Sequence, residues 1–393
     1  MRPNIRRVAL VGAGMTRFGV RKATYRDLIW EAGKACFDSV PALRPADLEG
    51  IVVGSVMPER TAFQSHISSL AAEALGIKPS RLSARTEHMC ASGTVGLRYA
   101  YAFIAAGLAD LVMVLGVEKL NVPTPDEAIL NMGTGVDREW EAAHGLTAPP
   151  CFALAAQAHM ASYGTTEEQM ALVSVKNHNH AAKNPYAHFQ KGASLDQVLC
   201  SRMIAAPFRL FMCSPITDGA AAVIVASEER ARDLTDHPVW IRGTGQALDG
   251  FTLSSLPSDY GSWPSLRRAG EEAYRMAGVG PDDVDLAEVH DCFAIAEIIA
   301  YEELGFCLKG EGGRFVEKGL SDYGGKVVVN PRGGLIGCGH PLGATGIAQA
   351  TEAFWQLRGE AGPRQVPEAR IALTHNNSGM GEHVVMLYGR DAA

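Results

Sequence analysis

The stretch VALVGAGMTRFG (residues 8–19) decides the fold, because the chain repeats its pattern as VWIRGTGQALDG (239–250). Both segments read as a short apolar strand that ends in a glycine turn. One such pair can arise by chance between any two strand–helix units, but further pairs in the same order indicate a duplicated half-domain. These pairs are the helical patterns 26–38 and 266–278, the segments PADLEGIVVGS (45–55) and PDDVDLAEVHD (281–291), and the segments CASGTVGLRYAYAFIAAG (90–107) and LGATGIAQATEAFWQLRG (342–359).

Short apolar strands alternate with helical patterns along most of the chain, which is typical of an α/β fold with sheets between helices. We expect an N-terminal half over residues 1–235 and a C-terminal half over 236–393. Residues 119–206 resemble neither half and are dense in Pro, Gly, His and Asn, with patterns for one or two helices. A long excursion of this kind usually forms a lid or a wall of a binding site, so we expect an inserted loop domain. Strands are expected at 8–12, 50–54, 111–117, 221–227, 239–243, 286–290, 371–375 and 383–389.

The composition excludes several classes of protein. The 393 residues are 47% hydrophobic and 20% charged, with a mean hydropathy of +0.01, which fits a large packed interior rather than a disordered chain. The net charge of −7 leaves no basic surplus for nucleic acid or an anionic membrane. No apolar run is long enough for a membrane helix or a signal peptide, and the eight scattered cysteines contain no Cys-x-x-Cys pair. We therefore expect a reduced, cytoplasmic protein. The excess of glycine, 42 residues, indicates tight turns or backbone that approaches a ligand closely.

Cys90 and His340 are the first candidate catalytic residues. Cys90 precedes a helical pattern in which Arg98 is the only charged residue, so its thiol is expected at the N-terminus of a buried helix. The helix dipole and free backbone N–H groups there stabilise a thiolate and a nearby oxyanion, with an inert core cysteine as the alternative. His340 lies in the glycine-rich loop NPRGGLIGCGHPLGATG (330–346), which is either a ligand-binding loop that carries a base or a turn with a solvated histidine. In the duplication, His340 lies near the position equivalent to Cys90, which predicts two helix N-termini that face one another.

Further titratable side chains lie at the ends of expected elements. His290 and Cys292 follow an apolar strand, and the carboxyl end of a strand is where open α/β sheets bind ligands. A structural cysteine is the alternative for Cys292, and Cys338 is a second candidate for thiol chemistry because it is close to His340. His144 in the insertion is a candidate for the wall of a site. No metal site is predicted, because the remaining histidines of the insertion lack zinc-like spacing and are expected to be solvated: His178, His180 and His188.

Together these motifs resemble the thiolase superfamily from about residue 5 to about residue 390. HMCASG (88–93) is similar to the family's nucleophilic cysteine box, and GHP (339–341) in its glycine-rich pattern is similar to the histidine box. HDCF (290–293) is similar to the motif of sterol-carrier-protein-type and archaeal-type thiolases, where most thiolases have Asn-Glu-Ala-Phe. The resemblance implies a thiolase-like duplicated αβαβα five-layered fold with an inserted loop domain, usually as a homodimer or tetramer.

The same resemblance implies a mechanism that uses acyl-CoA and CoA as substrates and no cofactor or metal. Cys90, activated by His340, would attack an acyl thioester and hold the acyl group. A second acyl-CoA would lose an α-proton, and its carbanion would attack the acyl-enzyme to give a 3-oxoacyl-CoA, which CoA cleaves in the reverse direction. Cys292 would be the second acid/base, because the C-terminal segment HNNSGMG (375–381) lacks the usual cysteine. His290 would orient a water or bind the thioester oxygen together with His340.

Backbone N–H groups of Cys90 and of the region of Asn377 and Gly379 would bind substrate as a further oxyanion hole, although Asn377 stands where the family has a glycine. The expected activity is that of a thiolase in lipid metabolism. The alternatives are a thiolase-like subunit that works with an OB-fold partner as an acyltransferase or aldolase, and a non-catalytic lipid-binding protein. A zinc-containing OB-fold partner fits the lack of an obvious basic cluster for the CoA phosphates. Acyl chain length, direction and the choice between Cys292 and Cys338 stay open at this point.

Overall fold

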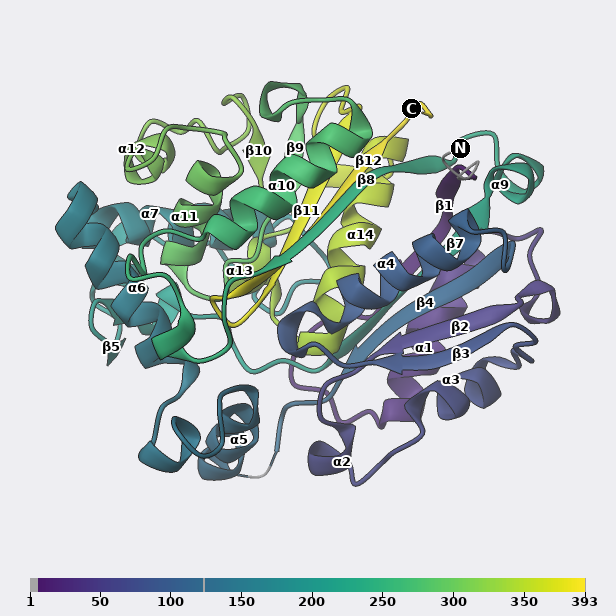
Figure 1. The fold of residues 1–393 in the computed structure, drawn as a ribbon, viewed down its shortest axis with the longest axis horizontal. Helices are drawn as coiled ribbons and strands as arrows, with labels where there is room; N and C mark the ends of the chain where they lie inside the picture. The colour runs from purple at the N-terminus through teal and green to yellow at the C-terminus, as the bar shows by residue number, and fades with distance from the viewer. Residues whose placement is uncertain (1–5, 123, 393) are drawn as a thin grey trace.

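The two halves of the chain each contribute five strands, in the same order, to a mixed sheet (Figure 1). The computed structural model describes residues 6–122 and 124–392. The N-terminal half runs β3–β2–β4–β7–β1 and the C-terminal half runs β10–β9–β11–β12–β8, and antiparallel pairing of β1 with β8 joins them into one ten-stranded sheet. The strands are β1 (Val8–Met15), β2 (Gly50–Gly54), β3 (Leu82–Thr86), β4 (Leu111–Glu118), β7 (Gly219–Ser227), β8 (Val239–Leu248), β9 (Leu286–Glu288), β10 (Val328–Val329), β11 (Ile371–Ser378) and β12 (Glu382–Gly389).

The helices repeat in the same way. α1 (Tyr25–Asp38) and α10 (Pro264–Ala277) follow the first strand of each half, and α4 (Ser92–Ala105) and α14 (Leu342–Arg358) follow the third. The segments that pair in the sequence therefore form equivalent elements, and the predicted duplication is confirmed. The other helices of the two halves are α2 (Pro58–Thr61), α3 (Ile67–Leu75), α9 (Glu228–Leu234), α11 (Ala294–Glu303), α12 (Gly312–Glu317) and α13 (Gly334–Cys338).

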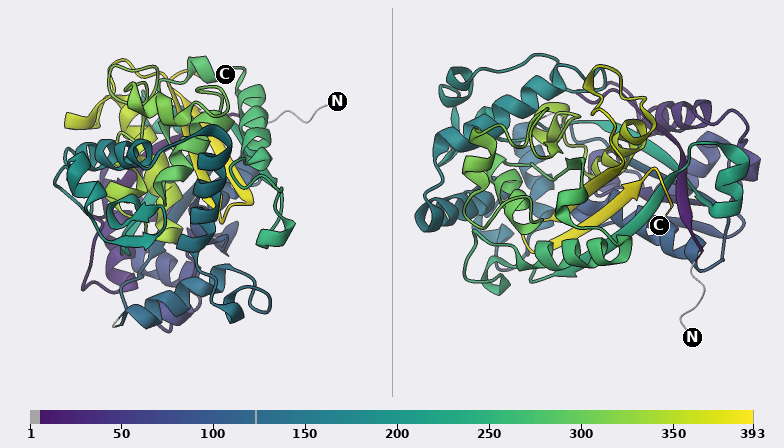
Figure 2. Two further views of the ribbon diagram at one scale, coloured as in Figure 1. Left: turned by 90° about the vertical axis from the view of Figure 1, so that its left-hand side faces the viewer. Right: turned by 90° about the horizontal axis from the view of Figure 1, so that it is seen from above.

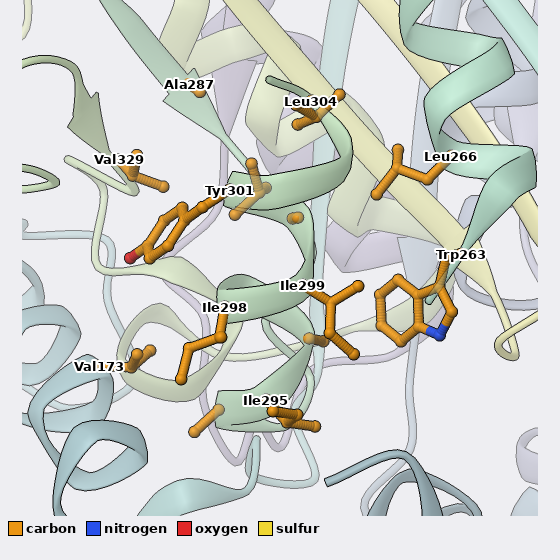
Figure 3. Close-up of a cluster of buried hydrophobic side chains, with 14 of the residues drawn as sticks. Val173, Trp263, Leu266, Ala287, Ile295, Ile298, Ile299, Tyr301, Leu304 and Val329 are labelled. Carbon is orange, nitrogen blue, oxygen red and sulfur yellow. The ribbon is translucent and has the colours of Figure 1, made fainter. Parts of the chain in front are cut away.

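Three buried clusters lie between five layers. The five strands of each half form one layer, the helices α4 and α14 lie between these two layers, and further helices cover the outer faces. In β4, Met113 packs under α1 and α3, whereas its neighbour Val112 faces the central helices α4 and α14. In β9, Leu286 faces the same central cluster, and its neighbour Ala287 faces the outer cluster under α10 and α11 (Figure 3). This alternation is what a strand covered by helices on both faces requires. The predicted α/β class and αβαβα layering are confirmed.

The central helices α4 and α14 meet at their N-terminal ends, where glycines allow the contact. A Cβ atom on Gly93 would lie 2.7 Å from the carbonyl oxygen of Gly343, and one on Gly343 would lie 2.6 Å from the carbonyl oxygen of Gly54. Both distances are shorter than a non-bonded contact, so only glycine fits at these positions. The approach brings together the residues that precede the two helices, Cys90 and His340, as the duplication predicts.

The insertion packs beside the C-terminal half (Figure 1; Figure 2). Its helices α6 (Ala148–Tyr163) and α7 (Glu167–Ala181) contact α11, and α7 also contacts α12 and α13. The boundaries at 119–206 and at 235 stay predictions. In the part of the chain that the structure describes, no helix is both long and apolar enough to cross a membrane. The insertion also contains α5 (Pro125–Met132) and α8 (Leu195–Leu199), and the short strands β5 (Met203–Ala205) and β6 (Phe208–Arg209) lie at its end.

The expectation of solvated histidines in the insertion is wrong for two of them. His178 and His180 are buried on α7. The ring of His180 lies 2.9 Å from the carbonyl oxygen of Asn330 and 2.8 Å from the Asp322 carboxylate. Because polar partners from the C-terminal half satisfy both ring nitrogens of His180, burial does not leave that ring unpaired.

Candidate active site

Cys90 lies in a 3-10 turn, Met89–Ala91, directly before α4. Met89 has a left-handed backbone with φ of 42°, which is uncommon for a residue other than glycine and turns the chain sharply into the helix. Burial raises the pKa of the Cys90 thiol to about 12, and its own backbone N–H opposes this rise. The resting thiol is therefore protonated at neutral pH, and a base is needed to make it a nucleophile.

His340 is buried just before α14 and has the geometry of that base. Its Nδ1 lies 2.7 Å from the hydroxyl oxygen of Thr345, and this hydroxyl donates to the carbonyl oxygen of Pro341 at 3.3 Å. Because the hydroxyl hydrogen is used on the carbonyl, the oxygen accepts from Nδ1–H, which leaves the lone pair on Nε2. Burial, followed by the nearby Arg332, lowers the pKa of His340 to about 3, so the ring is neutral.

His290 presents a second imidazole to the same place. It follows β9 and is fully buried. The side-chain nitrogen of Asn376 lies 3.0 Å from its Nδ1. Burial, and then His340, lower the pKa of His290 well below its ordinary value, so this ring is neutral as well. The two rings stand nearly perpendicular, with centroids 4.9 Å apart, and neither Nε2 has a hydrogen-bond partner among the described residues.

The three side chains converge from separate parts of the fold. The Cys90 sulfur and one ring nitrogen from each of His290 and His340 lie within 4.8 Å of one another. The structure thus brings together three of the residues that the sequence singles out. One thiol and two imidazoles are also donors that a zinc-class cation prefers. Whether His290 can act as a ligand depends on which of its nitrogens carries the proton.

Cys292 is buried two residues after His290, in the loop between β9 and α11. Burial raises the pKa of its thiol well above the ordinary value, and the Cys90 sulfur adds to the rise. The carbonyl oxygen of Cys292 accepts a hydrogen bond of 2.9 Å from the N–H of Ser214, which holds the loop in place.

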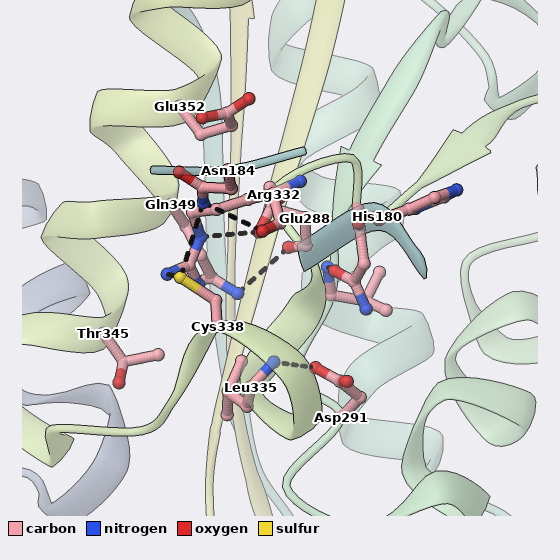
Figure 4. A network of polar contacts seen from close by, with 12 residues as sticks. His180, Asn184, Glu288, Asp291, Arg332, Leu335, Cys338, Thr345, Gln349 and Glu352 are labelled. Atoms are coloured by element: carbon pink, nitrogen blue, oxygen red, sulfur yellow. Dashed lines mark hydrogen bonds and ion pairs between the residues drawn. The ribbon is translucent and has the colours of Figure 1, made fainter. Parts of the chain in front are cut away.

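Cys338 has a different environment (Figure 4). Its sulfur accepts hydrogen bonds from the guanidinium of Arg332 at 3.2 Å and from the amide of Asn184 at 3.6 Å. Arg332 is fully buried and forms an ion pair of 3.1 Å with Glu288. Burial raises the pKa of Cys338 to about 11. The thiol therefore belongs to a buried ion network, and the choice of Cys292 as the second acid/base stays a prediction.

Asp291 holds together the two loops that carry His290 and His340, a role that sequence analysis missed. Its carboxylate accepts hydrogen bonds from the backbone N–H groups of Leu335 at 2.6 Å and Ile336 at 3.3 Å, in the first turn of α13 (Figure 4). The side chain of Asn177 on α7 donates to the same carboxylate at 2.7 Å. Asp291 thereby ties the loop of His290 to the loop that leads into His340. Its position inside the HDCF motif was the only signal for this role in the sequence.

Asn377 and Gly379 lie on the hairpin between β11 and β12, and β11 contacts the turn that carries Cys90. Asn377 is buried in β11, paired with His383 of β12, so its backbone is extended. No left-handed conformation is required there, which is why asparagine can stand in place of glycine. Gly379 has a φ of +62° in the turn itself.

Two buried histidines support this hairpin, and sequence analysis missed both. His383 Nε2 donates to the carbonyl oxygen of Met380 at 3.2 Å, so its Nδ1 is free to accept from His375 Nε2 at 3.0 Å. Burial lowers the pKa of His375 well below its ordinary value and that of His383 to about 4. His375 opens the segment that lacks the usual cysteine, and its ring is used to hold the hairpin.

His144 is not brought to the cluster. It is exposed at the end of a 3-10 turn, Ala142–His144, in the insertion. Among the described residues, the cluster of thiol and imidazole atoms consists of Cys90, His290 and His340, without His144. Its role as a wall of the substrate site stays a prediction.

Comparison with known proteins covers nearly the whole chain. Residues 8–193 match the family model "Thiolase, N-terminal domain" and residues 245–390 match "Thiolase C-terminal domain-like". The chain is 46% identical to an acetyl-CoA acetyltransferase of Methanothermobacter thermautotrophicus, over 96% of this chain and 97% of that protein. It is 39% identical to sterol carrier protein 2 of Bos taurus, over 97% of this chain and 72% of that protein. The solved structure described as "Ltp2-ChsH2(DUF35) aldolase" has a TM-score of 0.83 at 25% identity and covers 99% of both chains.

Proposed function

The chain belongs to the thiolase family and is an acyltransferase of the thiolase type, and from this premise we propose that it makes or cleaves 3-oxoacyl-CoA by Claisen condensation through an acyl group on Cys90. Acetyl-CoA, named for a relative that is 46% identical, is the expected acyl donor. The observation that supports the proposal most directly is the convergence of the Cys90 sulfur with His290 and His340.

The first half-reaction transfers an acyl group to Cys90. The Nε2 lone pair of His340 takes the thiol proton, and the sulfur attacks the carbonyl carbon of the acyl thioester. Backbone N–H groups of Cys90 and of the hairpin that carries Asn377 stabilise the oxyanion. The bond between the acyl carbon and the CoA sulfur breaks, and Cys292 gives its proton to the departing thiolate. The raised pKa of Cys292 suits it to hold that proton until this step.

The second half-reaction forms the carbon–carbon bond. The Cys292 thiolate removes an α-proton from a second acyl-CoA, and the resulting enolate oxygen accepts hydrogen bonds from His340, now protonated, and from His290. The α-carbon attacks the acyl carbon on Cys90, and the bond between that carbon and the Cys90 sulfur breaks. His340 returns its proton to the sulfur. All protons are restored, and the products are 3-oxoacyl-CoA and CoA.

The setting of the reaction is proposed on the same grounds. We expect a cytoplasmic enzyme of lipid metabolism that forms homodimers or tetramers and needs no cofactor or metal. A zinc-containing OB-fold partner that helps to bind CoA remains part of the proposal. The solved relative with a DUF35 component in its description supports an assembly with a second kind of chain.

The test is thiolysis of acetoacetyl-CoA by CoA. The wild-type protein is expected to consume the 3-oxo thioester and to carry an acetyl group on Cys90, visible by mass spectrometry. Cys90→Ala is expected to lose both because it lacks the nucleophile, whereas Cys292→Ser lacks the acid for the departing enolate and is expected to lose turnover, with Cys90 acetylated only slowly. Cys200→Ser changes an exposed cysteine outside the site and serves as the matched control.

The same assay separates the alternatives. Acetylation of wild-type Cys90 without turnover would contradict an autonomous thiolase and support a subunit that needs a partner, as in the solved structure described as an aldolase with a DUF35 component. Neither acetylation nor turnover would favour a lipid-binding protein without catalytic activity.

A further inference from the structure

Asn376 stands behind His290 at the end of β11 and is fully buried. Its side-chain nitrogen lies 3.0 Å from Nδ1 of His290 and 3.3 Å from the carbonyl oxygen of His375. Its side-chain oxygen accepts a hydrogen bond from the hydroxyl of Thr94 on α4. A backbone carbonyl can only accept, so the atom of Asn376 beside it must be the donating nitrogen. This contact fixes which end of the amide faces His290.

The amide orientation determines the proton on His290. Because the Asn376 nitrogen donates to Nδ1, that ring nitrogen must carry a lone pair. The neutral imidazole then has its only proton on Nε2. Since Nε2 has no partner among the described residues, it points a hydrogen-bond donor at the site. His340 has the opposite arrangement, because the Thr345 hydroxyl accepts from its Nδ1–H.

We propose that Asn376 is a positioning residue that holds His290 in the Nε2–H form, so that His290 donates to the oxygen of the bound thioester and is neither a second base nor a metal ligand. This inference rests on the proposed function for the identity of the ligand, but not for the proton on the ring. It divides the two imidazoles by role: His340 accepts a proton from Cys90, and His290 supplies a hydrogen bond.

The group behind His290 differs from the group behind a metal-binding histidine. A histidine that binds a metal usually donates its other ring N–H to a carboxylate or a carbonyl oxygen. In this chain the group behind His290 donates instead, which places a proton on the nitrogen that would have to bind the metal. Cys90, His290 and His340 therefore have the donor atoms of a zinc site, but Asn376 gives His290 the wrong proton for it.

Gly346 shows that the fold makes room for the pair of Asn376 and Thr94. A Cβ atom at Gly346 would lie 2.4 Å from the side-chain oxygen of Asn376 and 2.0 Å from the hydroxyl oxygen of Thr94. No other residue type fits there without displacing this hydrogen bond. The contact joins α4 of the N-terminal half to β11 of the C-terminal half, directly behind the catalytic cluster.

The direct test is the protonation of the ring nitrogens in the resting protein. Histidine labelled with nitrogen-15 is introduced, and long-range proton–nitrogen correlation spectra are recorded without substrate. His290→Asn and His340→Asn identify the two sets of signals by their loss. The expected result is a proton on Nε2 of His290 and on Nδ1 of His340. A His290 ring with its proton on Nδ1, or divided evenly between both nitrogens, would overturn the inference.

Two variants test Asn376 itself. Asn376→Asp places an acceptor behind His290, so Nδ1 of His290 is expected to become protonated. The Nε2 lone pair this releases is expected to bind Co²⁺ about 10- to 100-fold more tightly than in the wild type, seen as thiolate-to-cobalt absorption that Cys90→Ala abolishes. Asn376→Leu removes the donor without adding charge and is expected to populate the Nδ1–H form in part. Unchanged His290 signals in both variants would contradict the proposal.

Kinetics then connect the proton to the reaction. Asn376→Leu is expected to lower kcat and kcat/KM together by about 10- to 100-fold, because the lost hydrogen bond acts in the transition state. In a His290→Asn background the same change should cost less than about threefold, because Asn376 acts through His290. Equal losses in both backgrounds would show a structural role only. A wild-type protein without turnover would contradict the proposed function and leave the spectroscopic result to decide the inference.

Discussion

Replacing Thr345 by valine separates the orientation of His340 from its presence. Thr345 is fully buried, and its hydroxyl is the only group among the described residues that accepts from His340 Nδ1–H. Valine has nearly the same shape, so the change removes the acceptor without opening a cavity. In the variant, the form of His340 that can take a proton from Cys90 carries a buried N–H without a partner.

The magnitude follows from that unpaired group. A buried donor without an acceptor costs about 1–3 kcal/mol. Since about 1.4 kcal/mol corresponds to a factor of ten, the population of His340 with a free Nε2 lone pair falls by about 5- to 150-fold. The ring can avoid the cost by moving its proton to Nε2, where it no longer serves as a base. We therefore expect acetylation of Cys90 to slow by about the same factor.

The assay is rapid quenching of the protein with acetoacetyl-CoA, followed by mass spectrometry of the acetylated Cys90 peptide. Thr345→Ser keeps the hydroxyl and is the matched control, expected to stay within about threefold of the wild type. Urea unfolding of both variants shows whether the fold is retained. If Thr345→Val acetylates Cys90 as fast as the wild type, Thr345 does not set the tautomer, and the assignment of His340 as base loses its structural support.

Three further predictions concern stability. Four buried histidines have pKa values below the unfolded value of about 6.5, so the unfolded chain binds more protons than the folded chain: His290, His340, His375 and His383. The free energy of unfolding should therefore fall as pH drops below about 6.5, by up to about 1.4 kcal/mol per pH unit for each ring. Urea midpoints measured between about pH 7.5 and about pH 5.5 would show this fall, and a flat profile would contradict the burial of these rings. Gly93→Ala is expected to lower the free energy of unfolding by about 1–3 kcal/mol, because the added Cβ would lie 2.7 Å from the Gly343 carbonyl oxygen. An unchanged urea midpoint would show that α4 and α14 can separate freely. Glu118→Gln replaces a buried carboxylate that accepts from the N–H groups of Val56 and Gly343, at 2.7 Å and 3.1 Å. The change is expected to lower the free energy of unfolding by about 1–3 kcal/mol, and a urea midpoint equal to that of the wild type would contradict this.

The fold could be predicted because the same order of apolar strand and helix patterns occurs in both halves of the sequence. Sequence analysis missed β3 and β10, and each miss has a physical cause. β3 is an edge strand with a half-exposed, polar pattern, so its side chains do not show the apolar run of a central strand. β10 is only two residues long, Val328–Val329, too short for any periodicity to appear. Both strands take their place from parallel pairing with a neighbour, which lies outside the local sequence.

The candidate site could be predicted as far as reactive side chains reveal themselves. Cys90, His290 and His340 stand at ends of expected elements and carry titratable groups, so residue type and position were enough to single them out. Asn376 and Thr345 carry no such signal, because an amide or a hydroxyl becomes important only through the ring it faces. Which nitrogen of a histidine holds the proton depends on a partner far away in sequence or one turn along a helix, and only the folded structure shows that partner.

The duplicated fold also explains how two equivalent scaffolds place a thiol and an imidazole, the proposed nucleophile and base, opposite one another. The N-termini of α4 and α14 are equivalent positions, and a fully symmetric chain would place the same group before each. Here Cys90 precedes one helix and His340 precedes the other, so the pair is opposed across the contact at Gly93 and Gly343. The distance between sulfur and imidazole is then set by the packing of two long helices rather than by flexible loops. It follows that Gly93→Ala should slow acetylation of Cys90 by more than the fraction of unfolded protein accounts for, because the added methyl group forces apart the two helices that hold the reacting atoms.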